Sequence, residues 1–191
     1  MSYTTIAWII LIGCLLFLFA AFNPSSMAFG MQGAEAKLEV IRRYERLWVI
    51  SQYAFGLGAV VAAAGYLLLA RAGGPQAAYG GLLTLVSSGM LAGALLWGIN
   101  LFMRATDFEG FANGMQPNWP FLAYTLLTLL GLAVWGYVYL QGGFPVWLGW
   151  GTLVPALILL GLLLVFRDMP PFVYYLIGLE TVWVLFKQPP S

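Results

Sequence analysis

The sequence predicts an all-α integral membrane protein, a six-span helical bundle with an amphipathic cytoplasmic helix between spans one and two. Apolar residues make up 62% of the 191 residues and charged residues 8%, and the mean hydropathy is +0.88. Soluble domains average roughly 45–50% apolar and 25% charged residues. Because a span needs ~20 residues, six spans use ~120 and leave about 70 for connections. We therefore expect residues 1–191 to form a single transmembrane domain.

The first span is expected at about 4–22. No Lys or Arg precedes this apolar run, so we expect it to be retained rather than cleaved as a signal peptide. The turn-forming residues Asn23 to Ser26 follow it. Over about 34–47, Leu38 and Ile41 recur at helical spacing among charged residues, and Trp48 continues the pattern. This segment is predicted to be a helix that lies on the membrane surface and leads into span two.

The other spans are separated by short polar or Gly/Pro-rich segments. They are expected at about 47–70, 77–103, 119–140, 144–166 and 170–187. The last is the shortest, and it approaches a full span only if Pro170 and Pro171 begin the helix. Most tryptophans lie within about two turns of these boundaries, as interface anchoring predicts. They are Trp8, Trp48, Trp97, Trp119, Trp147, Trp150 and Trp183.

The orientation follows from the basic residues, which are enriched in cytoplasmic segments. One side of the predicted bundle has Arg71 and Lys187. The other side has Lys37, Arg42, Arg43, Arg46, Arg104 and Arg167. We expect this second side to face the cytoplasm and both termini to lie outside it. The short connections are typical of a multi-pass protein of a bacterial inner (plasma) membrane.

Several classes of function are disfavoured by composition. A net charge of +1 without a basic stripe predicts no nucleic-acid partner. The chain has no histidine, and its one cysteine, Cys14, lies in an apolar run, so neither a disulfide within the chain nor a metal site is expected. No nucleotide-binding or hydrolase motif occurs. The sequence therefore predicts no catalytic residue and specifies no cofactor, and the bilayer is the one certain partner.

Glu180 is the acidic residue that falls well inside a predicted span, ~15 Å deep at 1.5 Å per residue. A carboxyl group inside a membrane is costly and usually faces a bundle interior. We expect it to form a ligand-binding pocket with polar residues of spans two and three, namely Gln52, Ser87, Ser88 and Asn100. The alternative is that these side chains only hydrogen-bond between helices. Gly89 and Gly93 form a GxxxG pattern that favours a close helix seam within the chain.

Three functions follow from this arrangement. The favoured one is a non-enzymatic protein that binds or translocates a small, neutral or apolar solute in the bundle. The alternative is an accessory or structural subunit that packs against membrane protein partners, or a homo-oligomer. A membrane enzyme is the least favoured, with Arg104, Asp107, Glu109 and Asp168 as the residues that would hold a cation and an anionic substrate.

Overall fold

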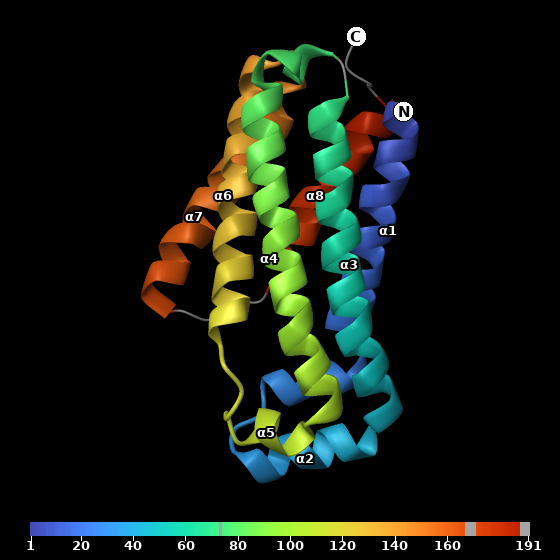
Figure 1. Cartoon of the computed structure of the whole chain (residues 1–191), viewed down its shortest axis with the longest axis vertical. Coiled ribbons are helices and arrows are strands. Elements are labelled where there is room, and N and C mark those ends of the chain that lie inside the picture. Colours follow the sequence, from blue (N-terminus) through green and yellow to red (C-terminus); the bar gives the residue numbers. More distant parts are fainter. Residues whose placement is uncertain (73, 167–170, 188–191) are drawn as a thin grey trace.

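The computed structural model describes residues 1–72, 74–166 and 171–187, and this part of the chain contains helices and no strand (Figure 1). Five helices are long and apolar enough to cross a membrane. They are α1 (Tyr3–Ala21), α3 (Glu45–Arg71), α4 (Gly80–Thr106, preceded by η2, Pro75–Tyr79), α6 (Trp119–Gln141) and α7 (Val146–Phe166). The prediction of a multi-span, all-helical membrane protein is confirmed at this level.

The predicted sixth span begins in residues outside the described part, and its remainder forms α8 (Phe172–Lys187). With 16 residues, α8 is ~24 Å long, which is less than the ~30 Å of a bilayer's hydrocarbon core. It nevertheless packs inside the bundle, because Tyr174, Tyr175, Ile177 and Thr181 are buried. α8 is thus an integral part of the bundle but too short to count among the membrane-spanning helices by length.

The predicted surface helix is shorter than expected. α2 (Ala34–Arg43) ends at Tyr44, whose backbone leaves helical geometry at φ −121° and ψ 33°, and α3 begins at Glu45. The break allows α2 to lie across one end of the bundle, which we call the lower end, while α3 rises along it (Figure 1). Arg42 pairs with Glu109 of the short α5 (Phe108–Ala112) at 3.7 Å, so the surface helices are tied to each other.

The helices of the bundle pack in a closed ring in the order α1, α3, α4, α6, α7 and α8, with α8 returning to α1. Glycines allow the closest approaches. A Cβ atom on Gly58 of α3 would lie 2.8 Å from the carbonyl oxygen of Gly13 in α1, so the backbones of α1 and α3 nearly touch there. A Cβ on Gly93 would lie 3.0 Å from the Cα of Tyr124. The predicted seam at Gly93 therefore joins α4 to α6 within the chain.

A second, smaller core closes the lower end. Ala28 of η1 (Pro24–Phe29), Ile41 of α2 and Trp48 of α3 are fully buried together. The indole N–H of Trp48 donates to the carbonyl oxygen of Arg104 at 3.0 Å and so links the lower ends of α3 and α4. The Asn23 amide donates to the Ser51 hydroxyl at 2.8 Å, which fixes the turn after α1 to α3.

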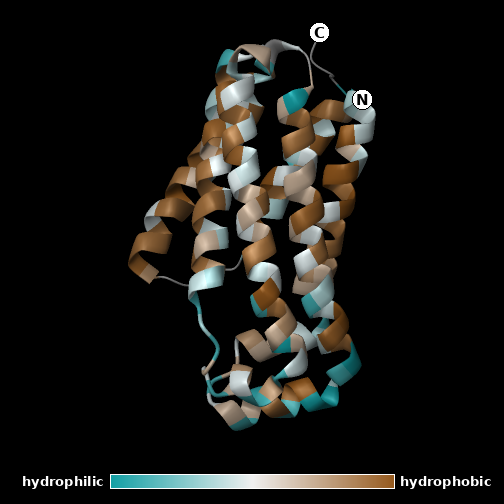
Figure 2. Ribbon diagram, viewed as in Figure 1, coloured by the Kyte–Doolittle hydropathy of each residue, from teal (hydrophilic) through white to brown (hydrophobic). Residues whose placement is uncertain are grey.

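The hydropathy of the surface agrees with a membrane setting. Hydrophilic residues gather on α2 and on the connections at the two ends, and the helices between them are mostly hydrophobic (Figure 2). The tryptophans near the span boundaries divide into two groups. Trp48 and Trp97 are buried inside the bundle, whereas the others are at least half exposed. The exposed ones are Trp8, Trp119, Trp147, Trp150 and Trp183.

Candidate functional site

A large cavity of about 770 Å³ opens at the lower end of the bundle, and we call it the lower vestibule. This volume lies in the range of roughly 300–1,000 Å³ that is typical of small-molecule sites. Its described lining residues are Phe17, Ala21, Ser26, Phe29, Gly30, Lys37, Phe55, Trp97, Arg104, Phe111, Gly114, Gln116, Asn118, Phe121, Pro171 and Phe172. They come from η1, α2 and α5 and from the lower ends of the long helices, so the vestibule lies where the chain covers the bundle from below.

The short α8 contributes to this space. Pro171 and Phe172, at the start of α8, line the vestibule, as does Ala21 at the end of the neighbouring α1. α8 has 16 residues and α3 has 27, so α8 is about 16 Å shorter. α3 and α4 continue to the lower end of the bundle, beside α2 and α5 (Figure 1). The vestibule therefore lies below the short α8, next to the lower parts of the longer helices.

Aromatic rings form most of the vestibule wall. Phe17 and Phe55 meet edge to face with centroids 4.8 Å apart, and the ring of Trp97 lies 6.0 Å from Phe55 and 5.9 Å from Phe121. Nearer the lower end, the ring of Phe29 lies 5.6 Å from that of Phe111. Rings in contact lose little mobility on binding a ligand, so this wall is a preformed apolar surface.

Two basic side chains lie at the floor of the vestibule and share one aromatic ring. The Lys37 ammonium lies 5.7 Å from the centroid of Phe111, and the Arg104 guanidinium lies 5.3 Å from the same centroid. The Arg104 guanidinium also lies 5.9 Å from the ring of Phe29. No acidic residue is among the described residues that line the vestibule. The described part of the floor therefore combines two basic side chains with aromatic rings.

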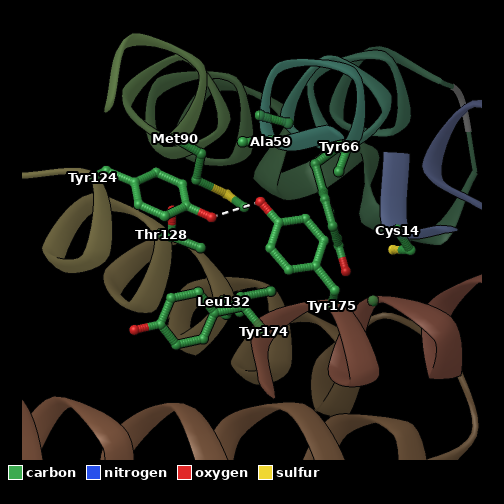
Figure 3. Close-up of a pocket in the computed structure, with 12 residues that line it drawn as sticks. Cys14, Ala59, Tyr66, Met90, Tyr124, Thr128, Leu132, Tyr174 and Tyr175 are labelled. Atoms are coloured by element: carbon green, nitrogen blue, oxygen red, sulfur yellow. Dashed lines mark hydrogen bonds between the residues drawn. The ribbon is translucent and has the colours of Figure 1, made fainter. Parts of the chain in front are cut away.

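Two pairs of stacked rings close the vestibule from above. Phe17 stacks on Tyr175 of α8 with centroids 3.7 Å apart, and Trp97 stacks on Tyr124 of α6 at 4.5 Å. The hydroxyl groups of Tyr124 and Tyr175 share a hydrogen bond of 2.5 Å, which joins the two pairs across the middle of the bundle (Figure 3). We call these four side chains the aromatic seal.

A much smaller cavity of about 20 Å³ lies above the seal. It is lined by Tyr124 and Tyr175 from below and by Cys14, Tyr66 and Met90 among others (Figure 3). A volume of this size holds about one water molecule. The seal thus separates a vestibule that could hold a whole ligand from a tightly packed interior.

The upper half of the bundle contains a set of buried, hydrogen-bonded polar side chains that was not predicted from the sequence. The Thr181 hydroxyl of α8 lies 3.2 Å from the Tyr66 hydroxyl of α3 and 3.2 Å from the Tyr139 hydroxyl of α6. The Trp135 N–H donates to the Ser87 hydroxyl at 3.0 Å. The two Thr181 contacts hold α8 against α3 and α6, and the Trp135 bond joins α6 to α4.

The five residues predicted to form one pocket lie in separate environments. Glu180 is half-buried on α8, and its Oε2 faces Gly151 of α7 without a hydrogen-bond partner among the described residues. Ser87 accepts the bond from Trp135, and Ser88, the next residue of α4, is exposed.

Gln52 and Asn100 lie much lower in the bundle. Gln52 is 14 positions from Tyr66 along α3, which is roughly 20 Å. The Asn100 amide donates to the Pro117 carbonyl at 3.0 Å, so it fastens the connection between α5 and α6 to α4. None of the five residues lines the vestibule or the small cavity. The geometry thus moves the candidate site away from Glu180 and to the aromatic vestibule.

The residues considered for catalysis have structural contacts. Asp107 accepts a hydrogen bond from the Gly110 backbone N–H at 2.8 Å and caps α5. Glu109 faces Arg42, and Asp168 lies outside the described residues. In the part of the chain that the structure describes, no group of three or more His, Cys, Asp or Glu side chains is placed to hold a metal ion.

The vestibule could not be predicted from the sequence, because its residues come from eight helices and the connection between α5 and α6. A signal was present, however. Phe17, Phe55, Trp97 and Phe121 all occur within about three turns of the lower ends of their helices. Counting along the predicted spans would have placed these rings at one height.

Comparisons of the chain with protein-family models, with curated proteins and with solved structures found no match. The fold and the site therefore rest on their own geometry, and on that basis the chain is a multi-span helical membrane protein.

Proposed function

We propose that this chain is a non-enzymatic membrane protein that binds a small, largely apolar solute in the lower vestibule. The observation that carries the proposal is a cavity of about 770 Å³ walled by aromatic rings at one end of a membrane bundle. Apolar cavities of this size with a few polar groups are the common form of small-molecule sites. The capping role of Asp107 and the ion pair of Glu109 support a protein without a catalytic centre.

The aromatic seal supports a site that a solute enters from the lower end of the bundle only. A solute in the vestibule would meet four packed rings and the bond between Tyr124 and Tyr175. Translocation in this proposal requires the two stacked pairs to separate, which makes the seal the step that controls passage.

The proposal includes the topology. α8 acts as the sixth span, the vestibule opens toward the cytoplasm, and both termini lie outside the cytoplasm of a cell whose inner (plasma) membrane holds the protein. The basic residues at the lower end support this orientation. A reporter that is active only in the cytoplasm, fused after the last residue, should be inactive. An active reporter would contradict the orientation.

The binding site is tested with a neutral probe. A sixteen-carbon alcohol with a diazirine at mid-chain is photolysed with the full-length protein in phosphatidylcholine nanodiscs, and labelled residues are mapped by mass spectrometry. We expect saturable labelling of the vestibule wall. Ala21→Trp places a large ring in the vestibule and should weaken labelling about tenfold, because it removes volume that the probe needs.

Ala92→Trp is the matched control, because Ala92 is exposed on α4 and outside the vestibule. It should label as the unmodified protein does. Ser26→Trp blocks the vestibule from another segment and covers the case in which Ala21→Trp fails to fold. Labelling that never saturates, or that is equal in the blocked and control proteins, would contradict the proposal.

Partner chains are tested in the same preparation. Native mass spectrometry from mild detergent resolves bound probe, homo-oligomers and other chains by mass. Stoichiometric partner chains without bound probe would favour an accessory subunit instead.

A further inference from the structure

We propose that the Glu180 carboxyl group is a proton-binding site inside the membrane, where the protonated group donates its O–H to the carbonyl oxygen of Gly151 between α8 and α7. The ligand of this site is a proton, and no solute takes part. The inference is independent of the lower vestibule, because neither residue lines it.

Glu180 lies near the middle of α8. It is eight residues after Phe172 and seven before Lys187, which is about 12 Å and about 10 Å from the two ends of the helix. Its neighbours one turn away, Leu176 and Trp183, are exposed on the outer surface of the bundle. The carboxyl group therefore lies at the border of the surface that acyl chains cover, where an ionised carboxyl group is costly.

The carboxyl group rests against the backbone of α7. A Cβ atom on Gly151 would lie 2.6 Å from the Oε2 atom of Glu180, so the missing side chain leaves room for the carboxyl group. Oε2 is buried and has no hydrogen-bond partner among the described residues. Buried polar atoms in proteins are normally hydrogen-bonded. The contact therefore needs a donor, and a proton on the carboxyl group supplies one.

The same residue of α7 offers an acceptor. In a regular helix the carbonyl oxygen of residue 151 accepts from the N–H of residue 155, but Pro155 has no N–H. The Gly151 carbonyl oxygen thus lacks its usual donor within an apolar helix. A carboxylate and a carbonyl oxygen both only accept hydrogen bonds. One proton on Glu180 joins them, and without it they repel each other, so this link between α7 and α8 depends on the proton.

The helices around Glu180 supply no cation that would offset the charge of a carboxylate. α1, α6 and α7 contain no Lys or Arg. Arg46 and Arg71 of α3 lie at the two ends of that helix. On α8, the Lys187 ammonium lies over the ring of Trp183, 5.4 Å from its centroid, and does not pair with Glu180.

The titratable groups that face this part of α8 are phenols and a thiol. The hydroxyl groups of Tyr66 and Tyr139 both contact Thr181, the residue after Glu180. The Sγ atom of Cys14 packs against the backbone of α8 two positions before Glu180, and α7 has no titratable side chain. Phenols and thiols are mostly neutral at pH 7. Among the described residues, nothing around Glu180 therefore stabilises a carboxylate.

Infrared spectroscopy tests the proton directly. The full-length protein and Glu180→Gln are reconstituted in phosphatidylcholine nanodiscs at pH 7, and the two spectra are subtracted. We expect a band from the C=O stretch of a protonated carboxylic acid that is lost in the variant. Glu180→Gln should fold, because its amide N–H can donate to the same carbonyl oxygen. Carboxylate bands in the difference spectrum would overturn the proposal.

A lipid-soluble carbodiimide gives an independent result with the unmodified protein. It takes up a protonated carboxyl group: the proton goes to a carbodiimide nitrogen, the carboxyl oxygen bonds to the central carbon, and the adduct rearranges to an N-acylurea with nothing released. Dicyclohexylcarbodiimide should add the mass of one reagent to the peptide that contains Glu180. Glu109, whose side chain is 75% exposed at the lower end, is the control carboxyl and should stay unlabelled. A Glu180 that carries no adduct would contradict the proposal.

Two alanine variants of α7 test the contact itself. Gly151→Ala places a Cβ atom 2.6 Å from Oε2 and moves the carboxyl group aside, which its flexible side chain allows. The acid band should then shift to higher frequency, as expected for a carboxylic acid that donates no hydrogen bond. Gly161→Ala is the matched control, because a Cβ at Gly161 meets no atom within 4 Å, and it should leave the band in place. Identical bands in the two variants would refute the bond to α7.

Pro155→Ala tests the acceptor. The alanine supplies the missing helix N–H, so the Gly151 carbonyl oxygen is shared between two donors and the bond from Glu180 weakens. The acid band should shift in the same direction as in Gly151→Ala, by a smaller amount. An unchanged band would show that Glu180 donates elsewhere and would refute the assignment of Gly151.

Discussion

The hydrogen bond between Tyr124 and Tyr175 should be the strongest single polar link across the bundle, and a double-mutant cycle measures it. Both hydroxyls are buried, and the bond between them is 2.5 Å long. Tyr124→Phe leaves the Tyr175 hydroxyl without its partner, which should cost ~1–2 kcal/mol of unfolding free energy. Tyr175→Phe should cost less, because Thr128, one turn along α6, also lines this cavity and offers the Tyr124 hydroxyl another acceptor.

The double variant removes both hydroxyls and so leaves neither one buried without a partner. Its loss of unfolding free energy should therefore be smaller than the sum of the two single losses by ~0.6–1.7 kcal/mol. The stacked rings remain in all three variants, so packing changes little. Unfolding by a denaturing detergent, followed by circular dichroism, gives the free energies. Tyr53→Phe is the control, since Tyr53 is 52% exposed, and it should change stability by less than about 0.5 kcal/mol. Additive single costs would refute the bond and the closure of the seal that depends on it.

Three further results are expected from the same unfolding assay. Gly58→Ala should destabilise the protein by ~1–3 kcal/mol relative to Gly98→Ala. A Cβ at Gly58 would lie 2.8 Å from the backbone of α1, whereas a Cβ at Gly98 would have no other atom within 4 Å. Equal stabilities of the two variants would contradict the close packing of α1 against α3. Gln52→Met should stabilise by about 1 kcal/mol, because the buried Gln52 amide has no partner among the described residues; a loss of stability would show that the amide is bonded. Trp48→Phe should cost ~1–2 kcal/mol through loss of its bond to the Arg104 carbonyl, and an unchanged protein would rule that bond out.

The sequence was sufficient for the helices but not for the site. Apolar runs of about 20 residues broken by Gly, Pro and Asn located every long helix, because in a bilayer a spanning chain has few alternatives to a helix. The position of a residue along its helix could also be predicted, since counting residues placed Glu180 well inside α8. The face of the helix on which a residue lies could not be predicted, because the rotation of a helix about its axis depends on packing between segments far apart in the chain.

Trp97 illustrates the limit. Its position near a span boundary is typical of a side chain that anchors the helix at the membrane interface. In the structure it is 2% exposed, stacks on Tyr124 and forms part of the vestibule roof. Nothing in the local sequence separates these two roles. The surface helix was likewise predicted as one piece, and its break at Tyr44 follows from the change of direction between the membrane surface and the bundle axis.

The position of α8 in the ring has a consequence for how the protein is made. A chain is synthesised from its N-terminus, so α1 to α7 enter the membrane before α8 is complete. Until then the hydroxyls of Tyr66 and Tyr139 have no Thr181 to meet, and Tyr124 has no Tyr175. The earlier helices form an open arc with hydrogen-bonding groups on its inner face. The ring therefore closes only when α8 joins the arc and supplies partners within the seal and above it.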